Sequence, residues 1–239
     1  MPIHTENVEY IHAGKTFEGF LAYDGATSAR RPGVVLVHEW WGLNDYIRRR
    51  TREIAELGYA AFALDMYGKG VVTETHEQAA KLMNSLMSNP DARDRAEAGV
   101  HILMSNPRVH AERLAAVGYC MGGSMALHMA RASMALRGVV ALHAGLKPDQ
   151  EAKPGTIKAK VLVCTGADDP MVGPDARNAF ADEMRKAGAD WQMNIYGGAR
   201  HAFTNPAADS KGLAALKYNA EADKRSWIAM REFLAEVLA

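Results

Sequence analysis

The sequence has 239 residues, of which 48% are hydrophobic and 23% charged, values typical of a globular protein with a substantial core. Lysine and arginine together number 28, as do aspartate and glutamate, so the formal net charge is zero. This balance argues against nucleic acid or an anionic membrane as the main partner, because both require a concentrated positive field.

The chain carries no visible signal for export or membrane insertion. Its first residues, MPIHTENVEY, contain neither a basic region nor an apolar stretch. No apolar run approaches the roughly 18 residues expected of a membrane span. The two cysteines, Cys120 and Cys164, are too few for a disulfide framework. We therefore expect a cytoplasmic protein, with secretion of an already processed chain as the alternative.

Short apolar runs alternate with longer amphipathic segments along the chain. The segment 8–21 alternates more polar residues with apolar ones and could form an antiparallel edge hairpin. The apolar runs that follow predict strands at 34–37, 59–64, 114–117, 139–142, 161–164 and 191–195. The amphipathic segments predict helices at about 45–57, 74–87, 92–105, 122–131, 174–186 and 218–237.

Strands that are apolar throughout are typical of a parallel sheet covered by helices on both faces. The alternation of strand and helix therefore predicts an α/β protein with an open, mostly parallel, doubly wound sheet. We see no repeat, linker or insertion large enough for a lid, and expect a single domain over residues 1–239.

The most informative segment is GYCMGG, residues 118–123, which lies between a predicted strand and a predicted helix. It matches the G-x-nucleophile-x-G turn of hydrolases, with Cys120 where most of them carry serine. Glycines allow the tight bend, which holds the residue between them exposed. The backbone N–H of Met121 then lies near the helix N-terminus, whose dipole favours an oxyanion or a thiolate. A buried structural thiol is the alternative for Cys120, whereas Cys164 lies inside an apolar run and is interpreted as core.

An acid and a base are expected later in the chain, in that order. The strand at 161–164 leads into GADDP, residues 166–170, on the side where open α/β sheets bind ligands. We favour Asp169 as the acid, with Asp168 as the alternative, and an aspartate here could also cap the next helix. His201 follows two glycines in the loop after the last predicted strand, a context that no other histidine shares. His201, oriented by Asp169, would assist attack by Cys120 on a carbonyl carbon and give an acyl-enzyme.

Five segments give the sequence a resemblance to the dienelactone hydrolase family of the α/β-hydrolase superfamily. They are VHEWWG (37–42), LDMYG (64–68), GYCMGG (118–123), GADDP (166–170) and GARHAF (198–203). The resemblance implies an α/β-hydrolase fold without a separate lid domain and a Cys120–Asp169–His201 triad. It also implies carboxymethylenebutenolidase-like hydrolysis of a small ester, lactone or thioester. No metal-ligand motif is visible, so we expect no metal and no cofactor, and we expect a monomer.

The resemblance also implies roles for two residues after the first parallel strand. Glu39 would contact the resting thiol and take part in generating the thiolate, unless it is a solvated loop carboxylate. The backbone N–H of Trp40 would join that of Met121 in the oxyanion hole. Residues that could line the pocket are His143, Tyr119 and Phe203.

The sequence departs from the family where the substrate is held. Dienelactone hydrolases bind the substrate carboxylate with two arginines and a tyrosine, and this chain has Asn205, His76 and Ala80 near those positions. Loss of a guanidinium is not a conservative change for carboxylate recognition. Hydrolysis is thus a firmer expectation than activity on dienelactone itself. A non-catalytic scaffold that binds a small molecule and a redox-sensing thiol protein remain as alternative functions.

Overall fold

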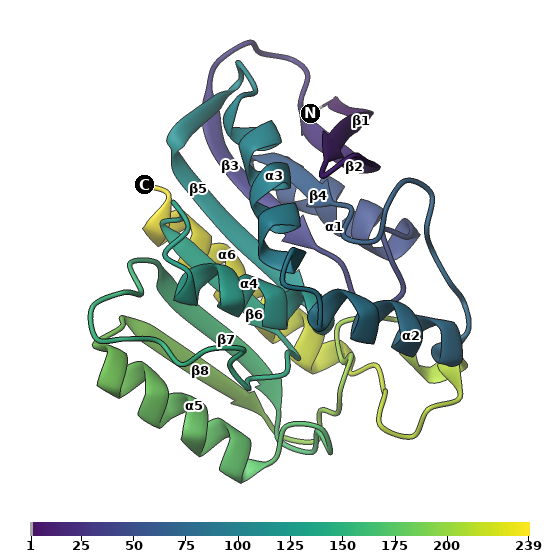
Figure 1. The fold of residues 1–239 in the computed structure, drawn as a ribbon, viewed down its shortest axis with the longest axis vertical. Helices are drawn as coiled ribbons and strands as arrows, with labels where there is room; N and C mark the ends of the chain where they lie inside the picture. Colours follow the sequence, from purple (N-terminus) through teal and green to yellow (C-terminus); the bar gives the residue numbers. More distant parts are fainter. Residues whose placement is uncertain (1) are drawn as a thin grey trace. The chain divides into compact units, whose positions relative to one another are not determined.

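The computed structural model describes residues 2–239, which form two compact units, residues 2–116 and 117–239. Strands and helices alternate along most of the chain (Figure 1). None of the helices in residues 2–239 is long and apolar enough to cross a bilayer. The prediction of a single domain stays a prediction.

The first unit begins with a hairpin, and its strands run in both directions. Its elements are β1 (Ile3–His12), β2 (Lys15–Asp24), β3 (Arg31–Val37), α1 (Asp45–Glu56), β4 (Ala60–Leu64), α2 (His76–Met87), α3 (Ala92–Met104) and most of β5 (Val109–Tyr119). β1 pairs antiparallel with β2 from Ile3 opposite Asp24 to His12 opposite Lys15. β2 is antiparallel to β4, which is parallel to β3. The expected hairpin is present and longer than predicted.

Helices cover both faces of the first unit's strands. Phe17 and Phe20 lie three positions apart on β2, so their side chains point to opposite faces. The guanidinium of Arg95 on α3 lies 5.7 Å from the centre of the Phe17 ring. That of Arg48 on α1 lies 4.7 Å from the centre of the Phe20 ring. α1 and α3 therefore lie on opposite faces, as a doubly wound arrangement requires.

The second unit contains a parallel array of strands with helices against it. Its elements are α4 (Met121–Arg131), β6 (Gly138–Leu142), β7 (Lys160–Gly166), α5 (Pro174–Ala187), β8 (Trp191–Tyr196), a 3₁₀ helix (Ala208–Lys211) and α6 (Ala220–Val237). β6, β7 and β8 are parallel neighbours. A buried ion pair of 2.8 Å joins Arg131 of α4 to Glu183 of α5. α6 packs against β6 and β7, behind the strands in Figure 1.

The parallel strands bring several predicted residues to one edge of the second unit. Because β6, β7 and β8 run in the same direction, their carboxyl ends meet at this edge. His143 directly follows β6, Asp169 lies in the loop after β7, and His201 lies in the loop after β8. The start of α4 is tied to the same edge, since the backbone N–H of Cys120 donates to the carbonyl of Leu142 at 2.9 Å.

Candidate active site

Cys120 occupies a sharp turn between β5 and α4. Its backbone has φ +54° and ψ −118°, a conformation that residues with a side chain rarely adopt. The turn also explains the first glycine of the motif: a Cβ on Gly118 would lie 2.0 Å from the carbonyl oxygen of Gly122. A Cβ on Gly123 would lie 2.6 Å from the Cβ of Ala144. The segment 118–123 therefore has the strand–turn–helix context that the motif requires.

Replacing Gly118 by alanine is expected to lower the free energy of unfolding by at least about 2 kcal/mol, because the backbone has to move to admit the new methyl group. Urea denaturation of both proteins measures the change. The matched control is Gly173→Ala, since a Cβ there has no atom within 4 Å and φ is −70°. That variant should stay within about 1 kcal/mol of the wild type. Equal stability of the two variants would contradict the account of the turn.

The structure brings Cys120, His201 and Asp169 together in one chain of contacts. Nε2 of His201 lies 3.1 Å from Sγ of Cys120. Nδ1 of the same ring lies 2.7 Å from Oδ2 of Asp169. The imidazole and the carboxylate are buried, whereas Cys120 is partly exposed. The sulfur is therefore accessible from solvent, whereas the contact between the imidazole and the carboxylate lies in the interior.

The two candidate aspartates differ in position. Asp169 is buried, and its second oxygen, Oδ1, accepts a hydrogen bond of 2.8 Å from the backbone N–H of Met171. Both carboxylate oxygens thus have partners, which fixes the group toward His201. Asp168 is exposed, and its backbone N–H donates to the carbonyl of Ala199. Asp169 is therefore the aspartate whose carboxylate the structure places against the imidazole.

The electrostatic surroundings of His201 favour its charged form. Burial alone lowers the pKa of His201, but the negative charge on Cys120 and the hydrogen bonds to Asp169 and Cys120 raise it to about 10. An imidazolium at neutral pH would lie between a carboxylate and the sulfur.

The second cysteine, Cys164, differs from Cys120. Burial raises the pKa of its thiol to about 12, and its sulfur lies 3.5 Å from the Tyr196 hydroxyl. Cys164 is therefore a core thiol that stays protonated.

Met121 is the first residue of α4, at the positive end of the helix dipole. The carbonyl of Cys120 already accepts hydrogen bonds from Gly123 and Ser124, so the helix begins immediately after the cysteine. Negative charge on the sulfur or on a nearby oxygen is favoured there. The role of Met121 in an oxyanion hole stays a prediction.

Glu39 and Trp40 follow β3 in the first unit. Glu39 is only 1% exposed, so it is not a solvated loop carboxylate. Burial lowers the pKa of His38, and its neutral ring accepts from the Met66 N–H at 3.2 Å and donates to the Glu39 carbonyl at 2.5 Å. The carbonyl of Trp40 accepts from the Tyr67 hydroxyl at 3.0 Å. The loop is thus held firmly, and the roles of Glu39 and Trp40 toward Cys120 stay predictions.

Tyr119, His143 and Phe203 are all buried, and their rings pack together. The centre of the His143 ring lies 6.1 Å from that of Tyr119 and 5.3 Å from that of Phe203. It also lies 5.5 Å from the ring of His201. The three residues form an aromatic cluster behind the candidate base, and their part in a substrate pocket stays a prediction. Thr204, whose hydroxyl lies 2.7 Å from Nε2 of His143, was not identifiable from any sequence motif.

The residues near the family's carboxylate-binding positions have other environments here. Asn205 is buried, and its side-chain oxygen accepts a hydrogen bond of 3.0 Å from the backbone N–H of Ala207. His76 is exposed at the start of α2, and Ala80 is half-buried on the same helix. None of the three supplies a guanidinium.

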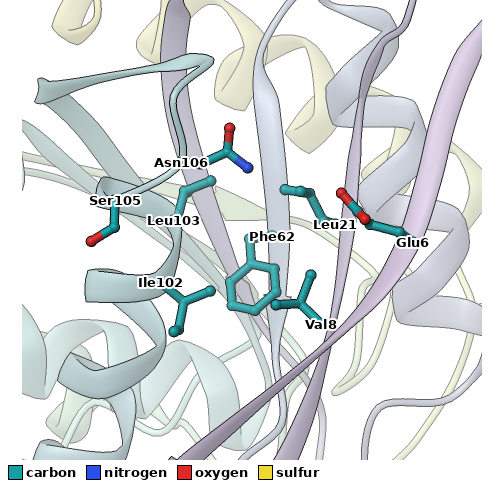
Figure 2. A pocket seen from close by; sticks show the side chains of 8 residues that line it. All are labelled: Glu6, Val8, Leu21, Phe62, Ile102, Leu103, Ser105 and Asn106. Carbon is teal, nitrogen blue, oxygen red and sulfur yellow. The ribbon is translucent and has the colours of Figure 1, made fainter.

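A separate hollow lies in the first unit, between the β1–β2 hairpin and α3 (Figure 2). Its volume is about 250 Å³. The apolar side chains that line it are those of Val8, Leu21, Phe62, Ile102 and Leu103, and the polar ones are those of Glu6, Ser105 and Asn106. It contains no predicted site residue, so it is distinct from the cysteine site.

Comparisons of the sequence and of the structure with known proteins agree with one another. The profile of the dienelactone hydrolase family matches residues 17–238. A protein of Aquifex aeolicus assigned as a carboxymethylenebutenolidase is 27% identical over 203 residues, which cover 83% of this chain and 86% of that protein. The solved structure named m3DLH is 41% identical, with a TM-score of 0.94 over 99% of both chains. That of P91, a dienelactone hydrolase-like promiscuous phosphotriesterase from metagenomic libraries, is 36% identical, with a TM-score of 0.95 over 99% of both chains.

The strand and helix order, together with these structural neighbours, defines an α/β-hydrolase fold, which confirms the predicted fold class. A nucleophile elbow at the start of a helix is a feature of this class. The chain belongs to the dienelactone hydrolase family, since the family profile covers nearly its whole length. The resemblance seen in the sequence is thereby confirmed, and the chain falls among hydrolases.

Proposed function

We propose that the protein is a carboxylic ester hydrolase that cleaves small esters, lactones or thioesters with Cys120 as its nucleophile. One observation carries the proposal: Cys120, His201 and Asp169 are linked by contacts of 3.1 and 2.7 Å. In covalent catalysis the nucleophile lies within hydrogen-bond reach of a base, and a third group orients that base. A binding scaffold would not need all three residues in this geometry.

The proposed reaction has two steps. The sulfur of Cys120 attacks the carbonyl carbon, a tetrahedral intermediate forms, and the imidazolium of His201 gives its proton to the leaving oxygen as the carbon–oxygen bond breaks. The product of this step is a thioester on Cys120 and a released alcohol. Neutral His201 then takes a proton from water, the hydroxide attacks the thioester, and the acid is released. Asp169 holds the ring and stabilises its positive charge in both steps.

Backbone groups would stabilise the oxyanion of the tetrahedral intermediate. Met121 supports this part of the proposal because it begins α4, where the helix dipole favours negative charge. For Trp40 as second donor, and for Glu39 as the carboxylate that helps to generate the thiolate, the support is the resemblance to the family. The location in the cytoplasm and the monomeric state are likewise retained as predictions.

We propose substrates without a free carboxylate. Asn205, His76 and Ala80 provide no guanidinium near the positions where the family binds the substrate carboxylate, and the side chain of Asn205 is hydrogen-bonded within its own turn. Catalytic efficiency, kcat/KM, on cis-dienelactone is therefore expected to be no higher than on a neutral ester of similar size. Measuring both substrates with one enzyme preparation tests this. A strong preference for the carboxylated lactone would show that another cation has replaced the missing arginines.

Phosphotriester hydrolysis is a second candidate activity. The observation that favours it is the likeness to P91, which is 36% identical over 99% of this chain and is named a promiscuous phosphotriesterase. A thiolate can attack phosphorus as well as carbonyl carbon and expel an alkoxide or phenolate, and water activated by His201 would then break the phosphorus–sulfur bond and free Cys120. Adding paraoxon to the substrate series above tests this candidate, and no turnover of paraoxon would remove it.

A further inference from the structure

His143 is held in an unusual backbone conformation beside the candidate active site. It directly follows β6, and its φ of +40° lies in the left-handed region that most residues avoid. Its backbone N–H donates to the carbonyl of Cys164 at 2.8 Å, and its side chain is fully buried. The preceding residue, Leu142, accepts the hydrogen bond from the backbone N–H of Cys120. The end of β6 is thus tied to the turn that carries the nucleophile.

The ring of His143 is tied to the loop that carries the base. Nε2 lies 2.7 Å from the hydroxyl of Thr204, which is 1% exposed. The ring meets that of His201 at an interplanar angle of 69° and that of Phe203 at 80°, both edge to face. His143 therefore contacts the 201–204 segment at three of its four residues.

This loop needs such support because little regular structure fixes it. It follows Gly197 and Gly198, and both Gly198 and Ala202 have positive φ values, +72° and +57°. The backbone of His201 bonds to Ala215 and Lys217, in another irregular segment. The hydrogen bond to Asp169 fixes one point of the imidazole but leaves its tilt open. A misplacement of about 1 Å at a reacting group can cost about 10²-fold in rate.

We propose that His143 and Thr204 are positioning residues, whose hydrogen bond holds the 201–204 loop so that Nε2 of His201 faces the sulfur of Cys120. Neither side chain has to touch the substrate for this role. The inference rests on the proposed function of the cysteine site, because it concerns the alignment of the base with the nucleophile.

Three variants test the pair: Thr204→Val, His143→Phe and the double variant. Thr204→Val keeps the shape of the side chain, and His143→Phe keeps an aromatic ring against His201 and Phe203. We expect each to lower kcat on p-nitrophenyl acetate about 10- to 100-fold with KM within about threefold of the wild type. If the hydrogen bond is the cause, the double variant loses no more than either single variant. Losses that multiply would overturn the proposal.

The matched control is Thr165→Val on β7. Thr165 is as buried as Thr204, and its hydroxyl has no hydrogen-bond partner among residues 2–239. The control should keep kcat within about twofold of the wild type, because no bond is removed. All assays are made well below each variant's melting temperature. If His143→Phe does not fold, Thr204→Val against Thr165→Val decides the question.

A second readout separates this inference from the proposed function. The rate of Cys120 alkylation by iodoacetamide between pH 5 and 9 reports the pairing of the sulfur with His201 without requiring turnover. We expect Thr204→Val to shift this profile relative to the wild type, and Thr165→Val to leave it unchanged. A wild-type profile and kcat in Thr204→Val would overturn the positioning role. An inactive wild type would instead contradict the proposed function.

Discussion

Replacing Cys120 by alanine is expected to lower turnover of p-nitrophenyl acetate by at least about 10³-fold, because the atom that forms the covalent intermediate is removed. The melting temperature should stay nearly unchanged. Cys120 is partly exposed, and alanine adds no atom to the crowded turn. Initial rates and thermal unfolding of the two proteins provide both measurements.

The second cysteine supplies the control for this experiment. Cys164 lies inside β7, fully buried, and burial keeps its thiol protonated. Cys164→Ala should therefore retain turnover, although it removes a buried atom and lowers the melting temperature. Retained turnover in Cys120→Ala, or loss of turnover only in Cys164→Ala, would show that the nucleophile has been assigned to the wrong residue.

Replacing Asp169 by asparagine is expected to lower kcat by about 10²- to 10⁴-fold, since an amide neither stabilises the imidazolium nor fixes its tautomer. The variant should also change the pH dependence. His201 has its pKa raised from 6.5 to about 10 in the folded protein, and Asp169 contributes to this increase. Without the carboxylate, His201 loses its proton at lower pH. The alkaline limb of the kcat/KM profile, which reports the free enzyme, should therefore move to lower pH, and a pH–rate series measures this shift.

The neighbouring aspartate is the matched control for Asp169. Asp168→Asn changes the same chemical group one residue away, at an exposed position. We expect kcat within about twofold of the wild type, because exposed substitutions away from the site rarely matter. If Asp168→Asn were the more damaging substitution, the acid would be the residue that the sequence left as the alternative.

Much of the fold was predictable because each strand and helix carries a local signal. The run Val161–Cys164 is apolar at every position and marks the buried centre of β7. The helix predicted at 174–186 begins at Pro174, where its missing N–H is tolerated, and ends before Gly188 in a left-handed conformation. Both elements have bounds within two residues of those predicted.

The ends of strands that contain both exposed and buried residues were harder to predict. β5 begins at Val109, five residues before the predicted strand, because its first half includes exposed Ala111 and Glu112 and is not an apolar run. The β1–β2 hairpin is longer than the predicted segment for the same reason: most of β1 is exposed. Polar residues on an edge strand weaken the pattern that sequence reasoning depends on.

Residues of the candidate site that lie in a sequence motif were predictable, whereas residues that come together only in the folded chain were not. The GYCMGG and GARHAF segments predicted that Cys120 and His201 belong to one site, and the two side chains lie 3.1 Å apart in the structure. The sequence favoured Asp169 and left Asp168 as the alternative, since both follow the same strand, and the carboxylate of Asp169 lies 2.7 Å from the His201 ring in the structure. The bond between His143 and Thr204 spans 61 positions and has no local signal.

Peptide mass spectrometry of the enzyme quenched in acid during turnover of p-nitrophenyl acetate tests the central claim most directly. A thioester survives acid, so the acyl group remains on the residue that carried it. We predict one acetyl group on the peptide containing Cys120, and none on that peptide in Cys120→Ala. Turnover with the acetyl group on another residue, or with none on Cys120, would contradict the proposed covalent mechanism.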